Sequence, residues 1–185
     1  MLDEPDDATT GVGLHIIEAD GWDGFVSAIR GFVAPQQNMV FADRDGDIGF
    51  YAPARIPVRD ETGAWVSTIP FEELPHTLNP DRGFVATANN KIVPDAYPHY
   101  ITSEWYGVSR IRRIYDGIDA QPIHDMDSMQ ALQIDTVSDT AQRLLPTLIR
   151  AEPQTDAANG ALALLARWNA DMAVDRPEPL IYSAW

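Results

Sequence analysis

The sequence predicts an α+β fold in which short antiparallel strands are followed by helices. Two apolar runs, residues 38–43 and 47–52, flank an Asp-Gly pair. This pattern is typical of a β-hairpin, because glycine adopts the positive φ of the turn at little cost. After residue 103, apolar residues recur every three or four positions, as in amphipathic helices. The chain of 185 residues, 45% of them hydrophobic, suffices for one domain or a large piece of one.

The composition excludes several classes of protein. The formal net charge is −15, and Lys91 is the only lysine. Without a basic stripe, a surface for nucleic acid or for an anionic membrane is excluded. The chain has no cysteine, which excludes disulfides, thiol catalysis and Cys-ligated metal sites. No apolar run approaches the roughly 20 residues that span a bilayer, and the acidic start does not resemble a signal peptide, so we expect any export signal to lie outside this chain.

The first third of the sequence predicts a disordered N-terminal segment followed by a helix. Residues 1–13 are acidic and small, which indicates a disordered lead-in. From Asp20, a candidate N-cap, apolar residues fall on one helical face up to about Gly31. These residues are Trp22, Phe25, Ile29 and Phe32.

The middle third predicts irregular structure and one more strand. Five prolines between residues 53 and 81 favour a segment that crosses a surface without long elements. Its predicted anchors are Trp65, Ile69, Phe71 and Leu74. Residues 83–88 form a short β-like run that ends at Asn89-Asn90, where two amides suit either a turn or a site.

The last part predicts helices. The first is expected over residues 103–115, capped by Thr102 or Ser103. Residues 125–149 predict one or two helices, with Ser138 as an internal cap and Pro146 as a kink or break, and residues 156–174 predict another. The apolar, aromatic end at residues 181–185 looks like a cut end, because natural domain ends are usually polar.

Motif chemistry alone identifies no reaction. The aspartates of residues 43–47 invite a calcium site, but an EF-hand loop needs Gly at position 6 and Glu at position 12, whereas Gly46 falls at 4 and Ala54 at 12. A solvated hairpin tip is the favoured interpretation. The four histidines lack metal-ligand spacing, and neither a Gly-x-Ser-x-Gly elbow nor a phosphate-binding glycine loop occurs. The residues therefore predict no metal site and no cofactor.

An ordered set of motifs is more specific. It comprises Pro35-Gln36-Gln37-Asn38, Gly46-Asp47-Ile48-Gly49-Phe50, Ile56-Pro57-Val58-Arg59, Ile69-Pro70-Phe71-Glu72-Glu73-Leu74-Pro75, Gly83 to Asn90, Tyr97-Pro98, Trp105, Arg110, Arg113-Ile114, Gln133 to Ser138 and Leu145-Pro146. In order and spacing, this set resembles the penicillin acylase (penicillin amidase) family of N-terminal nucleophile hydrolases, over about residues 14–175. The resemblance implies that residues 14–185 are part of the family's β chain, within an α/β/β/α sandwich.

The resemblance also implies an activity. Family members are precursors that cut themselves to expose a catalytic serine at the start of the β chain, and they hydrolyse the amide bonds of acylated small molecules such as β-lactams or acyl-homoserine lactones. The terminal serine attacks, and its own amine acts as the base. That serine is absent here, because the chain begins Met1-Leu2-Asp3. The expected partners are therefore the remaining α and β segments of the same precursor and a small acylated amide, and the family implies a periplasmic location.

Three residues take roles from the resemblance. Asn89 matches the asparagine whose side-chain amide stabilises the oxyanion, although a one-residue slip would select Asn90. Arg110 matches an arginine that organises the active site, and Met39 lies near the family's acyl pocket. For Asn89 and Asn90 the alternative is a turn without a catalytic role. For Arg110 it is a charge on the surface of a helix. Tyr100 and Ile101 stand where a calcium-binding carboxylate would follow the Tyr-Pro pair, so no calcium is predicted.

Two functions remain open from the sequence. The first is a fragment of an amidase that is inactive alone; the second is a stand-alone module that binds acyl amides or a partner without catalysis. In the fragment, exposed strand edges and apolar helix faces predict self-association. The charge of −15 opposes it, and the sequence does not decide between the two effects.

Overall fold

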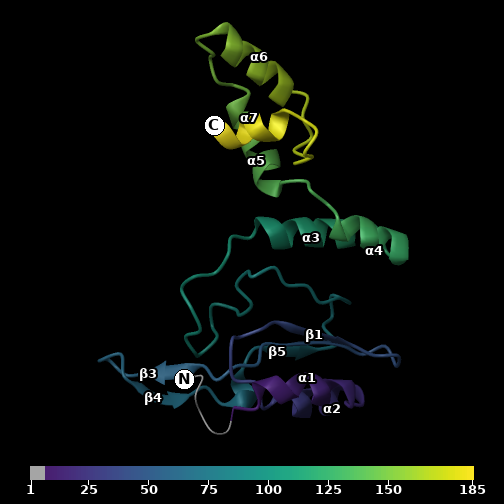
Figure 1. The fold of residues 1–185 in the computed structure, drawn as a ribbon, viewed down its shortest axis with the longest axis vertical. Coiled ribbons are helices and arrows are strands. Elements are labelled where there is room, and N and C mark those ends of the chain that lie inside the picture. Colours follow the sequence, from purple (N-terminus) through teal and green to yellow (C-terminus); the bar gives the residue numbers. More distant parts are fainter. Residues whose placement is uncertain (1–6) are drawn as a thin grey trace. The chain divides into compact units, whose positions relative to one another are not determined.

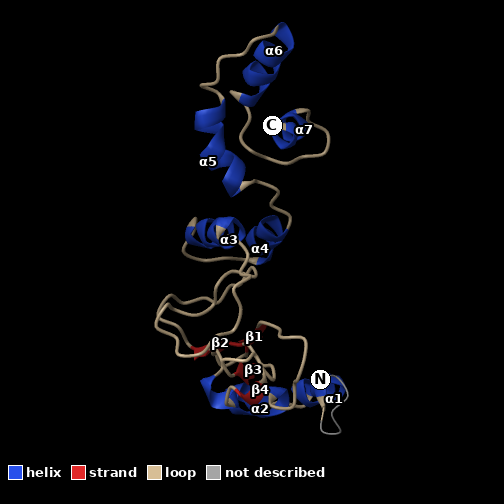
Figure 2. Ribbon diagram, turned by 90° about the vertical axis from the view of Figure 1, so that its left-hand side faces the viewer, coloured by secondary structure: helices blue, strands red, loops and turns tan. Residues whose placement is uncertain are grey.

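The computed structural model describes residues 7–185 of the chain. The chain divides into two compact units, Met1–Tyr106 and Gly107–Trp185. Within the described residues, all strands belong to the first unit, and the second contains helices and loops (Figure 2). This combination of helices and antiparallel strands confirms the α+β class.

The first unit is built on a three-stranded antiparallel sheet with the order β1-β2-β5. Strands β1 (Met39–Ala42) and β2 (Ile48–Tyr51) form the predicted hairpin, with Val40 opposite Phe50. Strand β5 (His76–Leu78) pairs with the other edge of β2. Helices α1 (Thr9–Ile17) and α2 (Gly21–Ile29) lie along one face of this sheet (Figure 1).

The core of this unit lies between the two helices and the sheet. Ile29 of α2 is completely buried, as the predicted helical face requires. The Trp22 ring packs against Phe41, with ring centroids 5.6 Å apart. A Cβ at Gly49 would lie 2.3 Å from the same ring, so only glycine lets the helix approach β2 this closely. The predicted apolar face of α2 is therefore the face that packs on the hairpin.

The hairpin tip is held by Asp43. Its Oδ1 accepts hydrogen bonds from the backbone N–H groups of Asp45, Gly46 and Asp47 at 2.9–3.0 Å. Gly46 has φ 99°, the left-handed conformation that the Asp-Gly pair predicts. This carboxylate thus organises the turn itself. Across residues 7–185, no group of three or more His, Cys, Asp or Glu residues gathers that could hold a metal ion.

The expected disordered lead-in is wrong for residues 9–13. These residues begin α1, and Val12 is buried in the core. The Oγ1 of Thr9 accepts a hydrogen bond from the backbone N–H of Val33 at 2.8 Å. The acidic composition of the start conceals the four-residue spacing of Val12 and Ile16, which places both on the side that packs on the core. Residues 1–6 lie outside the described residues.

The proline-rich middle is more regular than expected. A second hairpin joins β3 (Pro57–Arg59) to β4 (Trp65–Thr68), and the short 3-10 helix η1 (Phe71–Glu73) follows. Leu74 and Ile69 are buried and Phe71 is partly buried, as predicted, but Trp65 is 36% exposed and is no anchor. A proline is tolerated at position 57 because β3 has only one neighbouring strand in the described sheet.

The expected strand at residues 83–88 is also wrong. Residues 84–87 have no regular secondary structure, and β5 is the third strand instead. The Asn79 side chain accepts from the Ile48 N–H at 3.0 Å and donates to Asp47 Oδ1 at 2.8 Å, which fixes β5 against β2. Apolar composition alone could not show which of two neighbouring segments pairs with β2.

The second unit contains five helices in the described chain: α3 (Ser109–Asp119), α4 (Met126–Gln133), α5 (Asp139–Leu148), α6 (Asp156–Leu165) and α7 (Glu178–Ala184). Ser138 caps α5 as predicted, accepting from the Ala141 N–H at 3.1 Å. Pro146 lies inside α5 without ending it. Helix α3 begins at Ser109 rather than at residue 103, and α6 ends at Leu165 rather than at residue 174.

The core of the second unit is separate and smaller. It joins α5 and α6 to the segment that follows α6 and to α7, and the Trp168 ring of that segment lies 5.5 Å from the Tyr182 ring of α7. Its buried members are Ala141, Leu145, Leu148, Leu165, Trp168 and Ala170. Among the described helices of both units, none is long and apolar enough to cross a membrane.

Candidate functional site

Asn89 lies in an irregular segment of the first unit that follows residue 83. It has φ 61°, a left-handed backbone conformation that asparagine adopts more readily than most residues. The residue is exposed, and its backbone carbonyl accepts a hydrogen bond from the Tyr106 N–H at 3.0 Å. The backbone carbonyl of Asn89 is therefore held by Tyr106, while the residue itself is exposed at the surface.

Asn90 has a different task. Its Oδ1 accepts from the Ala88 N–H at 3.0 Å, and its Nδ2 donates to the Lys91 carbonyl at 2.9 Å. Both ends of the Asn90 amide thus stabilise the turn in which Asn89 sits. The turn interpretation of the Asn-Asn pair therefore holds for the Asn90 side chain. The assignment of Asn89 to the site stays a prediction.

The segment that carries Asn89 is attached to the rest of the unit at η1. The Tyr97 hydroxyl donates to the Glu73 carbonyl at 2.7 Å. The Nε2 of His99 lies 2.5 Å from Glu73 Oε2. Ile101 packs against the core between helices and sheet. A local ion pair between Lys91 and Asp95 lies within the same segment.

The attachment point is itself rigid. The Tyr51 ring stacks on Phe71 with centroids 4.7 Å apart, and the Tyr51 hydroxyl donates to the Phe71 carbonyl at 2.7 Å. The Arg30 guanidinium lies over the Phe71 ring, 4.3 Å from its centroid, and pairs with Glu72 at 2.6 Å. Burial, and then the negative charge of Glu72, raises the pKa of Tyr51 to about 12.

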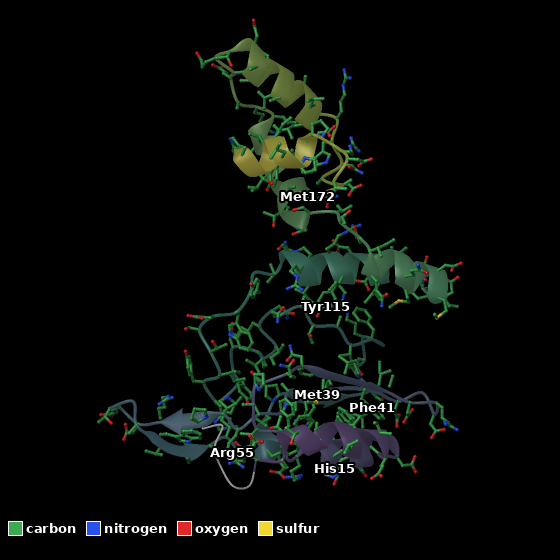
Figure 3. The ribbon with its side chains drawn as sticks, viewed as in Figure 1. His15, Met39, Phe41, Arg55, Tyr115 and Met172 are labelled. Carbon is green, nitrogen blue, oxygen red and sulfur yellow. The ribbon has the colours of Figure 1, made fainter. Side chains whose placement is uncertain are left out.

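Met39 is part of the core. It opens β1 opposite Tyr51, and its side chain packs against the cluster beneath the sheet, near Phe41 (Figure 3). Within the described residues it fills space between sheet and helices. Its assignment to an acyl pocket stays a prediction.

Arg110 lies on α3 in the second unit. It is exposed and lines a cavity of about 340 Å³, together with Arg113 and Asp135. The Arg113 Nε donates to Asp135 Oδ2 at 2.6 Å. The two candidate catalytic residues, Asn89 and Arg110, thus belong to different units.

Arg112 of α3 and Arg143 of α5 both bind the carboxylate of Asp139, at the start of α5. Arg112 donates to Asp139 at 3.0 Å, and Arg143 donates to the same carboxylate at 2.9 Å. Asp139 is buried, so these two guanidinium groups supply the partners that its charge needs. Their role is structural, unlike the role expected of Arg110.

Sequence reasoning missed Glu73, Tyr97 and His99. Their contacts join residues 24 and 26 positions apart, and nothing in the local pattern links them. The only signal is that Glu73 and Tyr97 fall within matched motifs.

Comparison with known proteins decides the family. The model of the family described as penicillin amidase matches residues 1–185. This chain belongs to the penicillin amidase family. Members of the family similar to it include the penicillin acylase 2 proenzyme of Pseudomonas sp. strain SE83, which is 31% identical over 123 residues, covering 60% of this chain and 16% of that protein.

Two further proteins that are similar to this chain agree with the family assignment. The acyl-homoserine lactone acylase QuiP of Pseudomonas aeruginosa is 29% identical over 123 residues, covering 60% of this chain and 14% of that protein. A thermostable penicillin G acylase from Alcaligenes faecalis matches in structure with a TM-score of 0.78 at 20% identity, covering all of this penicillin amidase chain and 37% of that chain. The chain therefore spans well under half the length of these relatives.

Proposed function

We propose that this chain is a segment of an acylase that hydrolyses the amide bond of N-acylated small molecules, and that it supplies Asn89 to the oxyanion hole. The observation that carries the proposal is the match of the penicillin amidase model over residues 1–185. One relative is named a proenzyme and another a lactone acylase, which supports a self-processed precursor and a substrate of the β-lactam or acyl-homoserine lactone type.

Asn89 suits this role by its chemistry. The attack on an amide carbonyl places negative charge on oxygen, and donors that are already aimed at that position lower the barrier. A neutral amide N–H stabilises the oxyanion without a fixed positive charge that would slow release of the product. The held backbone and exposed side chain of Asn89 support this assignment.

The nucleophile is proposed to come from another part of the precursor. It is a serine whose own α-amino group takes the proton as the hydroxyl attacks the carbonyl. That proton passes to the amide nitrogen as the C–N bond breaks and the amine leaves, and water then hydrolyses the acyl-enzyme to the acid and the free serine. Arg110, with a guanidinium fork suited to carbonyl and carboxylate groups, is proposed to orient polar groups at the site. A periplasmic location is part of the same proposal.

The proposal is tested with the complete gene product. A phenylacetyl β-lactam and a long-chain acyl-homoserine lactone are each incubated with the purified protein and, in parallel, with the 185-residue chain alone. We expect the complete protein to release the free amine from at least one of them, and the isolated chain to release none. A folded complete protein that binds these amides without hydrolysing them would instead favour the non-catalytic module.

A further inference from the structure

Residues 89–106 form a loop that is closed at its base. The Asn89 carbonyl accepts from the Tyr106 N–H at 3.0 Å, so the two ends of the loop meet at the residue that carries the candidate oxyanion donor. Within the loop, a turn joins the Tyr97 N–H to the Pro94 carbonyl at 3.1 Å. Compact surface loops whose ends lie close together frequently carry functional residues.

Glu73 fixes the far side of this loop by two separate bonds. Its backbone carbonyl accepts from the Tyr97 hydroxyl, and its carboxylate pairs with His99. The Tyr97 and His99 rings also meet edge to face, with centroids 5.6 Å apart. Burial, and then the nearby Glu73 charge, raises the pKa of Tyr97, which keeps its hydroxyl protonated as the donor.

The other side of Glu73 is anchored in the core. Glu73 is the last residue of η1. In the same short helix, Phe71 is stacked on buried Tyr51, and Glu72 pairs with Arg30. A chain of contacts thus runs from the sheet through η1 and Glu73 to the loop that carries Asn89. The carboxylate of Glu73 is 53% exposed, so its contact with His99 contributes little to global stability. The contact between Glu73 and His99 therefore matters for the position of the loop rather than for the stability of the fold.

We propose that Glu73 is a positioning residue for the acylase, because its bonds to Tyr97 and His99 set the loop at residues 89–106 and hence the direction of the Asn89 amide. This inference rests on the proposed function of Asn89. Donors of an oxyanion hole must be held close to their productive geometry, and small misplacements cost much of their effect. The residue acts through Asn89 and does not itself touch the substrate.

The first test compares variants at η1 in the complete, processed protein. Glu73→Ala removes the carboxylate but keeps the carbonyl that Tyr97 uses, and it is expected to lower kcat by about 10-fold to 100-fold with KM little changed. Glu73→Gln, which can still accept from His99, should recover part of the loss. The matched control is Glu61→Ala, since Glu61 is also exposed but lies in the turn between β3 and β4, outside both η1 and the loop. It should leave kcat near that of the unaltered protein.

The decisive test combines Glu73→Ala with Asn89→Gly. If Glu73 acts through Asn89, its substitution should lower kcat no further once the amide is gone. A full second loss in the double variant would overturn the positioning role while leaving the oxyanion role intact. An Asn89→Gly protein with unchanged kcat would contradict the oxyanion role itself, so the two failures are distinguishable.

A structural measurement accompanies the kinetics. Hydrogen exchange of the complete protein should show faster exchange of the Tyr106 amide in Glu73→Ala than in Glu61→Ala, because the base of the loop loosens. Equal protection in the two variants, together with equal kcat, would overturn the proposal.

Discussion

Replacing Asn89 by glycine in the complete protein is expected, under the proposed function, to lower kcat by about 10²-fold to 10³-fold, with KM changed little. The amide is expected to bond the oxygen only when that oxygen is charged, so its loss should fall on the chemical step. Glycine is chosen over alanine because Asn89 has φ 61°, where a Cβ is strained and glycine is not. The variant should therefore fold as the parent does, and rates at saturating substrate measure the effect.

The matched control is Asn79→Gly. Asn79 is the other left-handed asparagine among the described residues, with φ 48°, but its amide bonds the end of the sheet. This variant is expected to lose some stability and to keep its kcat. Loss of rate in both variants alike would indicate a general effect of the substitution, and an unchanged rate in Asn89→Gly would exclude Asn89 as the donor.

The stability of the chain is expected to fall as the pH rises from about 10 to about 12, and Tyr51 should account for up to about 3 kcal/mol of that loss. Burial raises the pKa of Tyr51 from 10.0 to about 12 in the folded chain. The folded state then holds a proton that the unfolded state releases, so the contribution is complete below pH 10 and is lost through pH 12. Urea unfolding of the chain at pH 9 and pH 11.5, followed by circular dichroism, measures it.

Two variants isolate this effect. Tyr51→Phe keeps the ring that stacks on Phe71 but lacks the ionising hydroxyl, so its free energy of unfolding should depend less on pH over the same range. Tyr100→Phe is the control, because Tyr100 is 73% exposed. If Tyr51→Phe and the parent chain lost stability equally, the burial of the Tyr51 hydroxyl would not be the cause.

Local patterns predicted the elements whose signals are local. The hairpin follows from an Asp-Gly turn between apolar runs, and α2 follows from one apolar face. Ser138 was recognised as a cap for the same reason. Pairing choices were not predictable in this way. Residues 83–88 are as apolar as a strand, yet β5 takes the edge of β2 because Asn79 bonds it there.

The start of α1 shows a second limit. Its composition resembles a disordered segment, but Val12 finds a place in the core that only the folded chain supplies. Conversely, Pro146 predicts a break, and α5 continues through it. Packing of Leu145 and Leu148 on both sides of the proline outweighs its local cost.

Some residues of the candidate site could likewise be predicted from the sequence, and others could not. Asn89 and Arg110 could be named because they belong to an ordered set of family motifs, and Met39 because it directly follows one of these motifs. Glu73 and His99 could not, since their pairing across 26 residues appears only when η1 and the loop are placed together. The sequence likewise did not distinguish Asn89 from Asn90. The structure shows that the Asn90 amide is bonded within the turn, and the role of Asn89 stays a prediction.

The most direct test of the acylase assignment is to determine the mature polypeptides of the complete gene product by intact mass and N-terminal sequencing. We predict that residues 1–185 occur within a processed chain that begins, upstream of this segment, with a free serine, threonine or cysteine able to act as the nucleophile. Replacing that first residue should abolish amine release. A single unprocessed polypeptide, with no such new N-terminus, would contradict the assignment.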